Sequence, residues 1–261
     1  MNETIYTDYL DDGRIAVIYF NRPHVMNALN RSAMERFAAV VADLADVETL
    51  RAVILTGAGT RAFCSGGDLQ ELSQLTTQDQ ALDFITLMGD ALRRLETLPV
   101  PVIAAINGYA LGGGSEIAMA CDMRIVDSAA RMGFVQARLA LTPGWGAGQR
   151  LLAVVGYARA MELLLRAEPL PADELLALNL VNRVTASGGA LDAALALARS
   201  FTRWDHQVII SIKRLLRAGI ERPPADAAQI ERDIFPPLWA ADAHLNAVAD
   251  FLHAQKQKKG D

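Results

Sequence analysis

Two glycine-rich segments carry the residues of this chain that are best suited to chemistry. Residues 63–69 read FCSGGDL and residues 111–116 read LGGGSE, and each segment follows a buried apolar stretch. Glycine has no Cβ, so backbone N–H groups in such loops can approach a ligand closely. The second segment opens an apolar helix, where unpaired N–H groups and the helix dipole favour negative charge. Two such donors on one carbonyl oxygen make an oxyanion hole. Alternatively, each loop is only a tight strand-to-helix turn.

An acidic residue, Glu116, lies directly after the second glycine run. A carboxyl group in that place can carry a proton to or from a substrate. The alternative is that an acidic side chain in a first helical turn merely offsets the helix dipole.

Other constellations are weaker. Residues 57–62 (GAGTRA) imitate a dinucleotide-binding fingerprint, but FCSGG follows them where that motif needs a helix. The four histidines show no metal-ligand spacing, so we predict no metal site. Cys64, Ser65 and Ser115 could be imagined as nucleophiles, yet none has an evident local base.

Alternating strands and helices must position these loops. Strands are predicted at residues 5–10, 14–20, 51–56, 102–106, 123–126, 131–135 and 181–184. Helices are predicted from Ser32 as N-cap, at 77–98, 117–121, 147–165, 171–178, 190–202 and 206–218, and as one long helix at 224–255. We therefore predict an α/β core at residues 1–187 and a helical C-terminal region at 188–261.

Composition limits the classes of function. The 261 residues are 52% hydrophobic and 21% charged with a net charge of −5, which suits a globular enzyme and disfavours nucleic acid as a partner. Two cysteines make no disulfide framework, the first residues lack the apolar core of a signal peptide, and no apolar run could cross a bilayer. We therefore predict a cytoplasmic protein without a membrane partner.

The chain resembles the crotonase (enoyl-CoA hydratase/isomerase) superfamily. The resemblance rests on NRPHVMNALN, AVILTGAGTRAFCSGGDL, AAINGYALGGGSEIAMACDMRIV and FVQARLALTPGWGAGQRL, which occur in family order and spacing. It implies a spiral of ββα units, a helical C-terminal region that builds trimers or dimers of trimers, and an acyl-CoA thioester substrate. Coenzyme A would be part of that substrate, so no separate cofactor is predicted.

The same resemblance assigns roles to residues. The amides of Gly67 and Gly113 would form the oxyanion hole, and Glu116 would be a catalytic carboxyl. The site for the adenine and phosphates of coenzyme A would be lined by Arg22, Met26, Ala28, Ala62, Asp68 and Leu69. Trp145 could shape an acyl pocket, although an indole near a helix start is more often part of a core.

One position departs from the pattern of the hydratases, which use two glutamates. Alignment on Pro143-Gly144 places Gln136 where the second glutamate belongs. A glutamine amide can hydrogen-bond a water but cannot exchange a proton near neutral pH. Decarboxylation of a malonyl-type thioester and isomerisation of a double bond can each run with one carboxyl. Residues 134–146 and 231–248 also resemble ethylmalonyl-CoA decarboxylase. An idle acyl-CoA binding protein remains the alternative from another class.

Overall fold

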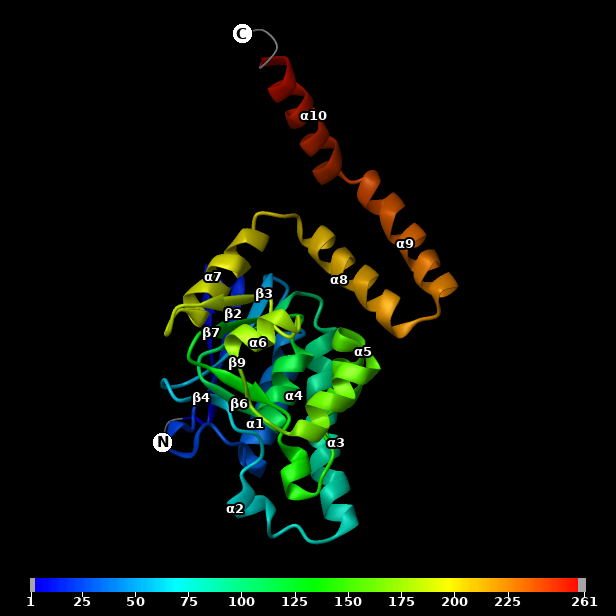
Figure 1. The fold of residues 1–261 in the computed structure, drawn as a ribbon. Coiled ribbons are helices and arrows are strands. Elements are labelled where there is room, and N and C mark those ends of the chain that lie inside the picture. The colour runs from blue at the N-terminus through cyan, green and yellow to red at the C-terminus, as the bar shows by residue number, and fades with distance from the viewer. Residues whose placement is uncertain (1–2, 258–261) are drawn as a thin grey trace. The chain divides into compact units, whose positions relative to one another are not determined.

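The computed structural model describes residues 3–257 (Figure 1). Contacts between Cα atoms divide the chain into two compact units, with the boundary between Phe201 and Thr202. The first unit holds both β-sheets and the second holds only helices. The predicted boundary lies earlier, after residue 187. The difference is α7 (Ala190–Phe201), whose Ala190, Ala194 and Ala198 are fully buried beside the strands of the first unit.

A six-stranded sheet forms the centre of the first unit. Its order is β1-β2-β3-β5-β7-β10, and all neighbours are parallel except the β1–β2 hairpin. The bounds are Ile5–Leu10 for β1, Ile15–Phe20 for β2, Ala52–Gly57 for β3, Val102–Ile106 for β5, Met123–Asp127 for β7 and Arg183–Thr185 for β10. The predicted hairpin is confirmed.

A smaller sheet has the order β4-β6-β8-β9. Its strands are β4 (Ala62–Cys64), β6 (Tyr109–Leu111), β8 (Arg131–Gly133) and β9 (Leu170–Pro171). Three times a strand of the large sheet is followed by a strand of the small sheet and then by helix: β3-β4 before α2 (Leu69–Leu72) and α3 (Gln78–Thr97), β5-β6 before α4 (Gly113–Ala120), and β7-β8 before α5 (Ala147–Arg166). This repetition confirms the predicted α/β spiral of ββα units.

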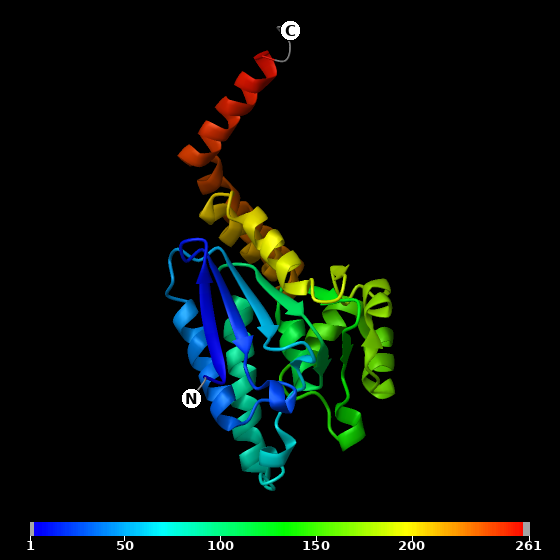
Figure 2. The same ribbon diagram turned by 90° about the vertical axis from the view of Figure 1, so that its left-hand side faces the viewer.

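Helices cover both faces of the large sheet, whose strands run side by side in Figure 2. On β2, Ile15 and Val17 join the core beneath α7, whereas Ala16 and Ile18 join the larger core with α1 (Arg31–Leu44) and α3. Parallel strands that are buried on both faces need apolar residues at successive positions. These four successive residues of β2 are all apolar. The core therefore lies on both sides of the sheet.

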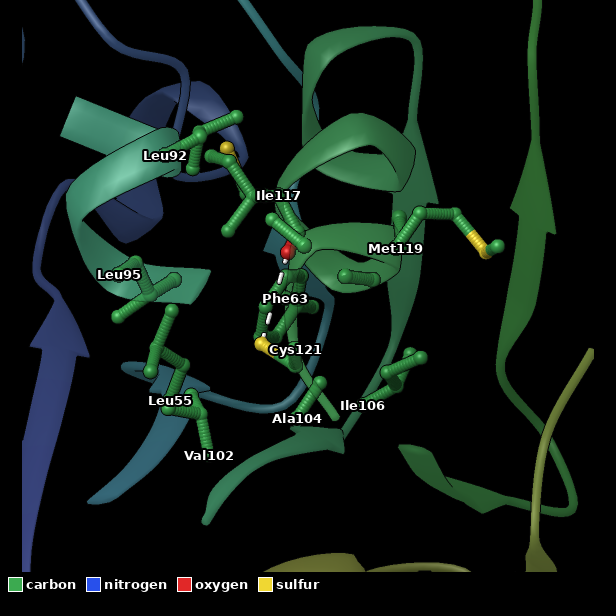
Figure 3. Close-up of a cluster of buried hydrophobic side chains, with 14 of the residues drawn as sticks. Leu55, Phe63, Leu92, Leu95, Val102, Ala104, Ile106, Ile117, Met119 and Cys121 are labelled. Carbon is green, nitrogen blue, oxygen red and sulfur yellow. Dashed lines mark hydrogen bonds between the residues drawn. The ribbon is translucent and has the colours of Figure 1, made fainter. Parts of the chain in front are cut away.

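Helix α4 packs beside α3 and against the strands (Figure 3). Leu92 and Leu95 of α3 lie on the side toward which Ile117 and Cys121 point, and the strand residues Leu55, Val102, Ala104 and Ile106 lie below. The Cys121 Sγ is 3.5 Å from the carbonyl oxygen of Ile117. This packing fixes α4, so the glycines at its first turn are held against a rigid core.

Some predicted boundaries were wrong. Asn30 rather than Ser32 caps α1, because its side chain accepts a hydrogen bond from the N–H of Ala33. The predicted long helix is two helices, α9 (Pro224–Trp239) and α10 (Asp242–Gln257). Pro236 and Pro237 lie in the last turns of α9 and lack N–H donors, which weakens the helix where it ends.

The remaining short elements are η1 (Pro23–Val25), η2 (Gln136–Leu139) and α6 (Ala172–Ala177). The second unit consists of α8 (His206–Glu221), α9 and α10, and α8 contacts α9. It exposes many large apolar side chains, namely Ile212, Leu216, Ile220, Phe235, Trp239, Leu245, Val248, Phe251 and Leu252. In the described part of the chain, no helix is long and apolar enough to cross a membrane. Assembly into trimers and a cytoplasmic location stay predictions.

Candidate active site

The two glycine-rich loops touch. A Cβ added to Gly66, where φ is +94°, would lie 2.8 Å from the backbone nitrogen of Gly113. A Cβ on Gly114 would overlap the carbonyl oxygen of Cys64. Only glycine allows the backbones to approach this closely. The loop after β4 therefore lies directly against the start of α4.

The N–H groups of Gly67 and Gly113 are both left without acceptors within the described residues. Leu29 forms backbone hydrogen bonds with the residues before and after Gly67. Its N–H donates to Gly66 O at 2.8 Å, and its carbonyl accepts from the N–H of Asp68 at 2.9 Å. The N–H of Gly67 therefore points away from Leu29. Gly113 is the first residue of α4, where an N–H has no partner within the helix. Two donors are thus available in adjacent loops.

Ser115 and Cys64 serve the structure of these loops. Ser115 is fully buried, and its hydroxyl bonds Ala110 O at 2.7 Å and accepts from the N–H of Gly133 at 3.1 Å. It joins α4 to β6 and β8. Burial raises the pKa of the Cys64 thiol to about 12, so the thiolate needed for attack is scarce. Neither residue has the environment of a nucleophile.

Glu116 is buried and its carboxylate accepts four hydrogen bonds. Oε1 accepts from Gln136 Nε2 at 2.9 Å and from the N–H of Gly144 at 3.3 Å. Oε2 accepts from the N–H groups of Trp145 at 2.7 Å and Ala147 at 3.1 Å. Three of these donors come from the backbone at the start of α5. Sequence reasoning missed them, because backbone donors leave no signal in residue type.

These surroundings act on the protonation of Glu116 in opposite directions. Burial raises the pKa of its carboxyl group above the ordinary value of 4.5, while the hydrogen bonds from Ala147, Trp145, Gly144 and Gln136 lower it. The desolvation is the largest effect, so the net pKa is raised. A raised pKa keeps a carboxyl group available as a proton donor closer to neutral pH.

The raised pKa predicts how stability depends on pH. Between pH 4.5 and the folded-state pKa, the folded protein binds more protons at Glu116 than the unfolded chain does. The contribution of Glu116 to the free energy of unfolding is therefore expected to fall as pH rises through that window. Urea unfolding of the native protein and of Glu116→Gln, at several pH values, measures the difference. A matched control is Glu162→Gln, whose side chain is 45% exposed. A constant difference between native protein and Glu116→Gln would contradict the prediction.

Gln136 faces Glu116 with its amide. Its Nε2 donates to Glu116, while its Oε1 is buried and has no partner among the described residues. Oε1 can accept this bond in either protonation state of Glu116, provided that the proton lies on Oε2. The structure thus brings Gln136 and Glu116 together, and their catalytic roles stay predictions.

Trp145 lies over Gly113. A Cβ on Gly113 would be 2.6 Å from Cη2 of the indole and nearer still to Cζ3. The carbonyl oxygen of Trp145 accepts from Arg150 Nη1 at 2.6 Å, and Arg150 Nε pairs with Glu96 at 2.7 Å. Arg150 and Glu96 thus position the segment that contains three of the donors to Glu116, a role the sequence did not reveal.

The residues predicted to line the coenzyme A site fall into two groups. Arg22 Nη1 donates to Ala28 O at 2.6 Å and to Asp68 Oδ2 at 2.9 Å, so these three residues form one cluster. Leu69 begins α2 next to Asp68 and is 58% exposed. The site role of this cluster stays a prediction.

Met26 and Ala62 have other surroundings. Met26 helps line a cleft of about 640 Å³ at the carboxyl edge of the large sheet, together with residues 57–61 and 107–109. Ala62 is buried in β4, and its carbonyl accepts from Asn27 Nδ2 at 2.8 Å. Among the described residues, no three His, Cys, Asp or Glu side chains form a group that could hold a metal ion.

Comparisons with known proteins agree with this fold. Residues 11–259 match the enoyl-CoA hydratase/isomerase family. The short-chain-enoyl-CoA hydratase of Clostridium acetobutylicum is 35% identical over 245 residues, which are 94% of each chain. The ethylmalonyl-CoA decarboxylase of Gallus gallus is 32% identical over 237 residues, 90% of this chain and 79% of that one.

A solved structure shows the same fold. The enoyl-CoA hydratase of Bacillus anthracis superposes with a TM-score of 0.91 at 30% identity, covering 97% of both chains. The family match, the curated relatives and the solved structure each span nearly the whole chain. The chain belongs to the enoyl-CoA hydratase/isomerase family and is an acyl-CoA enzyme.

Proposed function

We propose that this enzyme forms a thioester enolate that the N–H groups of Gly67 and Gly113 stabilise, and that Glu116 is its single proton-transferring carboxyl. Both N–H groups lack acceptors in the described part of the chain, and their loops are in contact. Donors that are already oriented stabilise a developing oxyanion without reorganising. Gly113 and Glu116 are three residues apart on α4, so they lie on one face of the helix.

The observation that selects a reaction is the 2.9 Å hydrogen bond between Gln136 Nε2 and Glu116 Oε1. A second carboxyl group at position 136 would provide the other half of acid–base catalysis for water addition, and an amide cannot. The partners of Glu116 are this amide and three backbone N–H groups. We therefore favour a reaction that needs one proton transfer.

Decarboxylation of a short malonyl-type thioester meets that requirement. The bond between Cα and the carboxylate carbon breaks, carbon dioxide leaves, and the bonding electrons remain as the enolate. Protonated Glu116 then gives its proton to Cα, which yields the saturated acyl thioester, and Glu116 regains a proton from solvent. The similarity to the ethylmalonyl-CoA decarboxylase of Gallus gallus supports this choice.

Hydration is the second candidate, because the short-chain-enoyl-CoA hydratase and other relatives carry that activity in their names. The experiment that separates the two incubates the protein with crotonyl-CoA and, separately, with methylmalonyl-CoA and ethylmalonyl-CoA. We expect carbon dioxide and a saturated acyl-CoA from a malonyl-type substrate, and slow loss of the enoyl-thioester absorbance of crotonyl-CoA.

The opposite results would change the assignment in definite ways. Rapid loss of the enoyl-thioester absorbance would contradict the proposed role of Gln136. Binding of all three thioesters without turnover would favour the idle acyl-CoA binder over an enzyme. Glu162→Gln, which alters an exposed carboxyl on α5, is the control for nonspecific effects of removing a glutamate.

A further inference from the structure

The indole of Trp145 takes the place that a side chain at position 113 would occupy. A Cβ built on Gly113 meets Cζ3, Cη2 and Cε3 of Trp145, with the last two 2.6 and 2.8 Å away. Real Cβ atoms do not come this close to other atoms, so the six-membered part of the indole rests on the α-carbon of Gly113. The ring therefore fills the volume next to the α-carbon of that residue.

Hydrogen bonds hold the backbone of Trp145 in place. The N–H of Trp145 donates to Glu116 Oε2 at 2.7 Å, and its carbonyl accepts from Arg150 Nη1 at 2.6 Å. Arg150 is paired with Glu96, and the two side chains are only 13% and 14% exposed. Trp145 itself is 5% exposed, so neighbouring atoms enclose its ring. Moving the ring away from Gly113 would disturb this packing.

We propose that Trp145 is the residue that limits the length of the acyl group, so that the site encloses butyryl-sized chains and has no room for the end of octanoyl-sized chains. This inference rests on the proposed function in one respect: the thioester oxygen must lie at the N–H of Gly113. The acyl chain then starts one bond away from that oxygen, beside the α-carbon that the indole covers. A short chain ends before it reaches the ring, whereas a long chain needs the volume that the ring fills.

Binding of saturated acyl-CoA thioesters tests the limit without turnover. Isothermal titration calorimetry gives dissociation constants for coenzyme A, butyryl-CoA, hexanoyl-CoA and octanoyl-CoA with the native protein and with Trp145→Ala. Each methylene that becomes buried strengthens binding about fourfold. We expect the affinity of the native protein to stay level for chains longer than butyryl. The affinity of Trp145→Ala is expected to rise about fourfold for each methylene added up to octanoyl-CoA.

Two further variants keep the test decisive. Trp145→Phe retains most of the packing and replaces the alanine variant if that variant fails to fold. We expect its affinity to rise with chain length over part of the series. Trp204→Ala is the matched control, because Trp204 is 54% exposed and belongs to the helical unit, which contains none of the proposed site residues. It is expected to behave like the native protein.

The results that would contradict the role of Trp145 differ from those that would contradict the proposed reaction. If native binding strengthens steadily up to octanoyl-CoA, or if neither Trp145 variant gains affinity for the longer chains, Trp145 does not limit the acyl group. If the limit is observed but no malonyl-type substrate loses carbon dioxide, the proposed reaction is wrong and the role of Trp145 stands.

Discussion

Gly113→Ala is expected to lower kcat for every enolate-forming reaction of this protein by about 10²–10³-fold, the usual effect of losing one oxyanion donor. The new methyl group cannot coexist with the indole of Trp145, which lies 2.6 Å or less from its position. Either the ring or the loop must move, and movement of the loop turns the N–H of residue 113 away from the substrate oxygen. Steady-state rates with the best malonyl-type substrate measure the loss.

Two companion variants show the cause of that loss. Gly89→Ala is a glycine-to-alanine change within α3 whose Cβ meets no atom within 4 Å, so we expect unchanged rates. The double variant Gly113→Ala with Trp145→Ala removes the clashing ring and is expected to recover part of the activity. If Gly113→Ala alone retains nearly native rates, the amide at this position is not an oxyanion donor.

Gln136→Glu is expected to raise the rate of crotonyl-CoA hydration by about 10²–10⁴-fold, the range over which general acid–base catalysis acts. The new carboxyl group would lie where Gln136 Nε2 now lies, 2.9 Å from Glu116 Oε1. Two carboxyl groups at that distance share one proton, so one can act as base while the other acts as acid. Loss of the enoyl-thioester absorbance at 25 °C gives the rate directly.

Gln136→Met is the matched control for this gain. Methionine has a similar length but no ionisable group, so hydration should stay at the native rate. The double variant Glu116→Gln with Gln136→Glu again has one carboxyl group, at the opposite position, and should also hydrate slowly. A gain in either control would show that the number of carboxyl groups does not decide the reaction. A failure of Gln136→Glu to gain would point to a site that cannot hold the water.

Much of the fold was predictable because short stretches of sequence indicate its strands and helices. The apolar run of β5 and the turn between β1 and β2 fixed those strands at Val102–Ile106 and Ile5–Leu10. Helix α3 was predicted to start at Thr77 and starts at Gln78, and Thr77 caps it through a reciprocal pair of hydrogen bonds with Gln80. These signals act within a few residues of each other, so the sequence alone carries them.

The small sheet and the environment of Glu116 could not be predicted in this way. The β9 strand has two residues, too few to show an alternating pattern, and its existence depends on pairing with β8. Three of the four donors to Glu116 are backbone groups 28, 29 and 31 positions further along the chain. Only the folded backbone brings them to the carboxylate. Family resemblance located Glu116 and Gln136, but the role of Arg150 required the structure.

The meeting of α4 and α5 has an electrostatic consequence for catalysis. Glu116 and the free N–H of Gly113 lie in the first turn of α4, and the N–H groups of Trp145 and Ala147 that bind Glu116 lie at the start of α5. The positive ends of two helix dipoles therefore converge on one small volume. In the proposed reaction that volume carries a single excess electron charge throughout. The charge resides first on the carboxylate of the substrate, then on the enolate oxygen and finally on Glu116. The two helix N-termini stabilise one negative charge at each of these stages. The reaction can therefore proceed without a counter-ion entering or leaving the site.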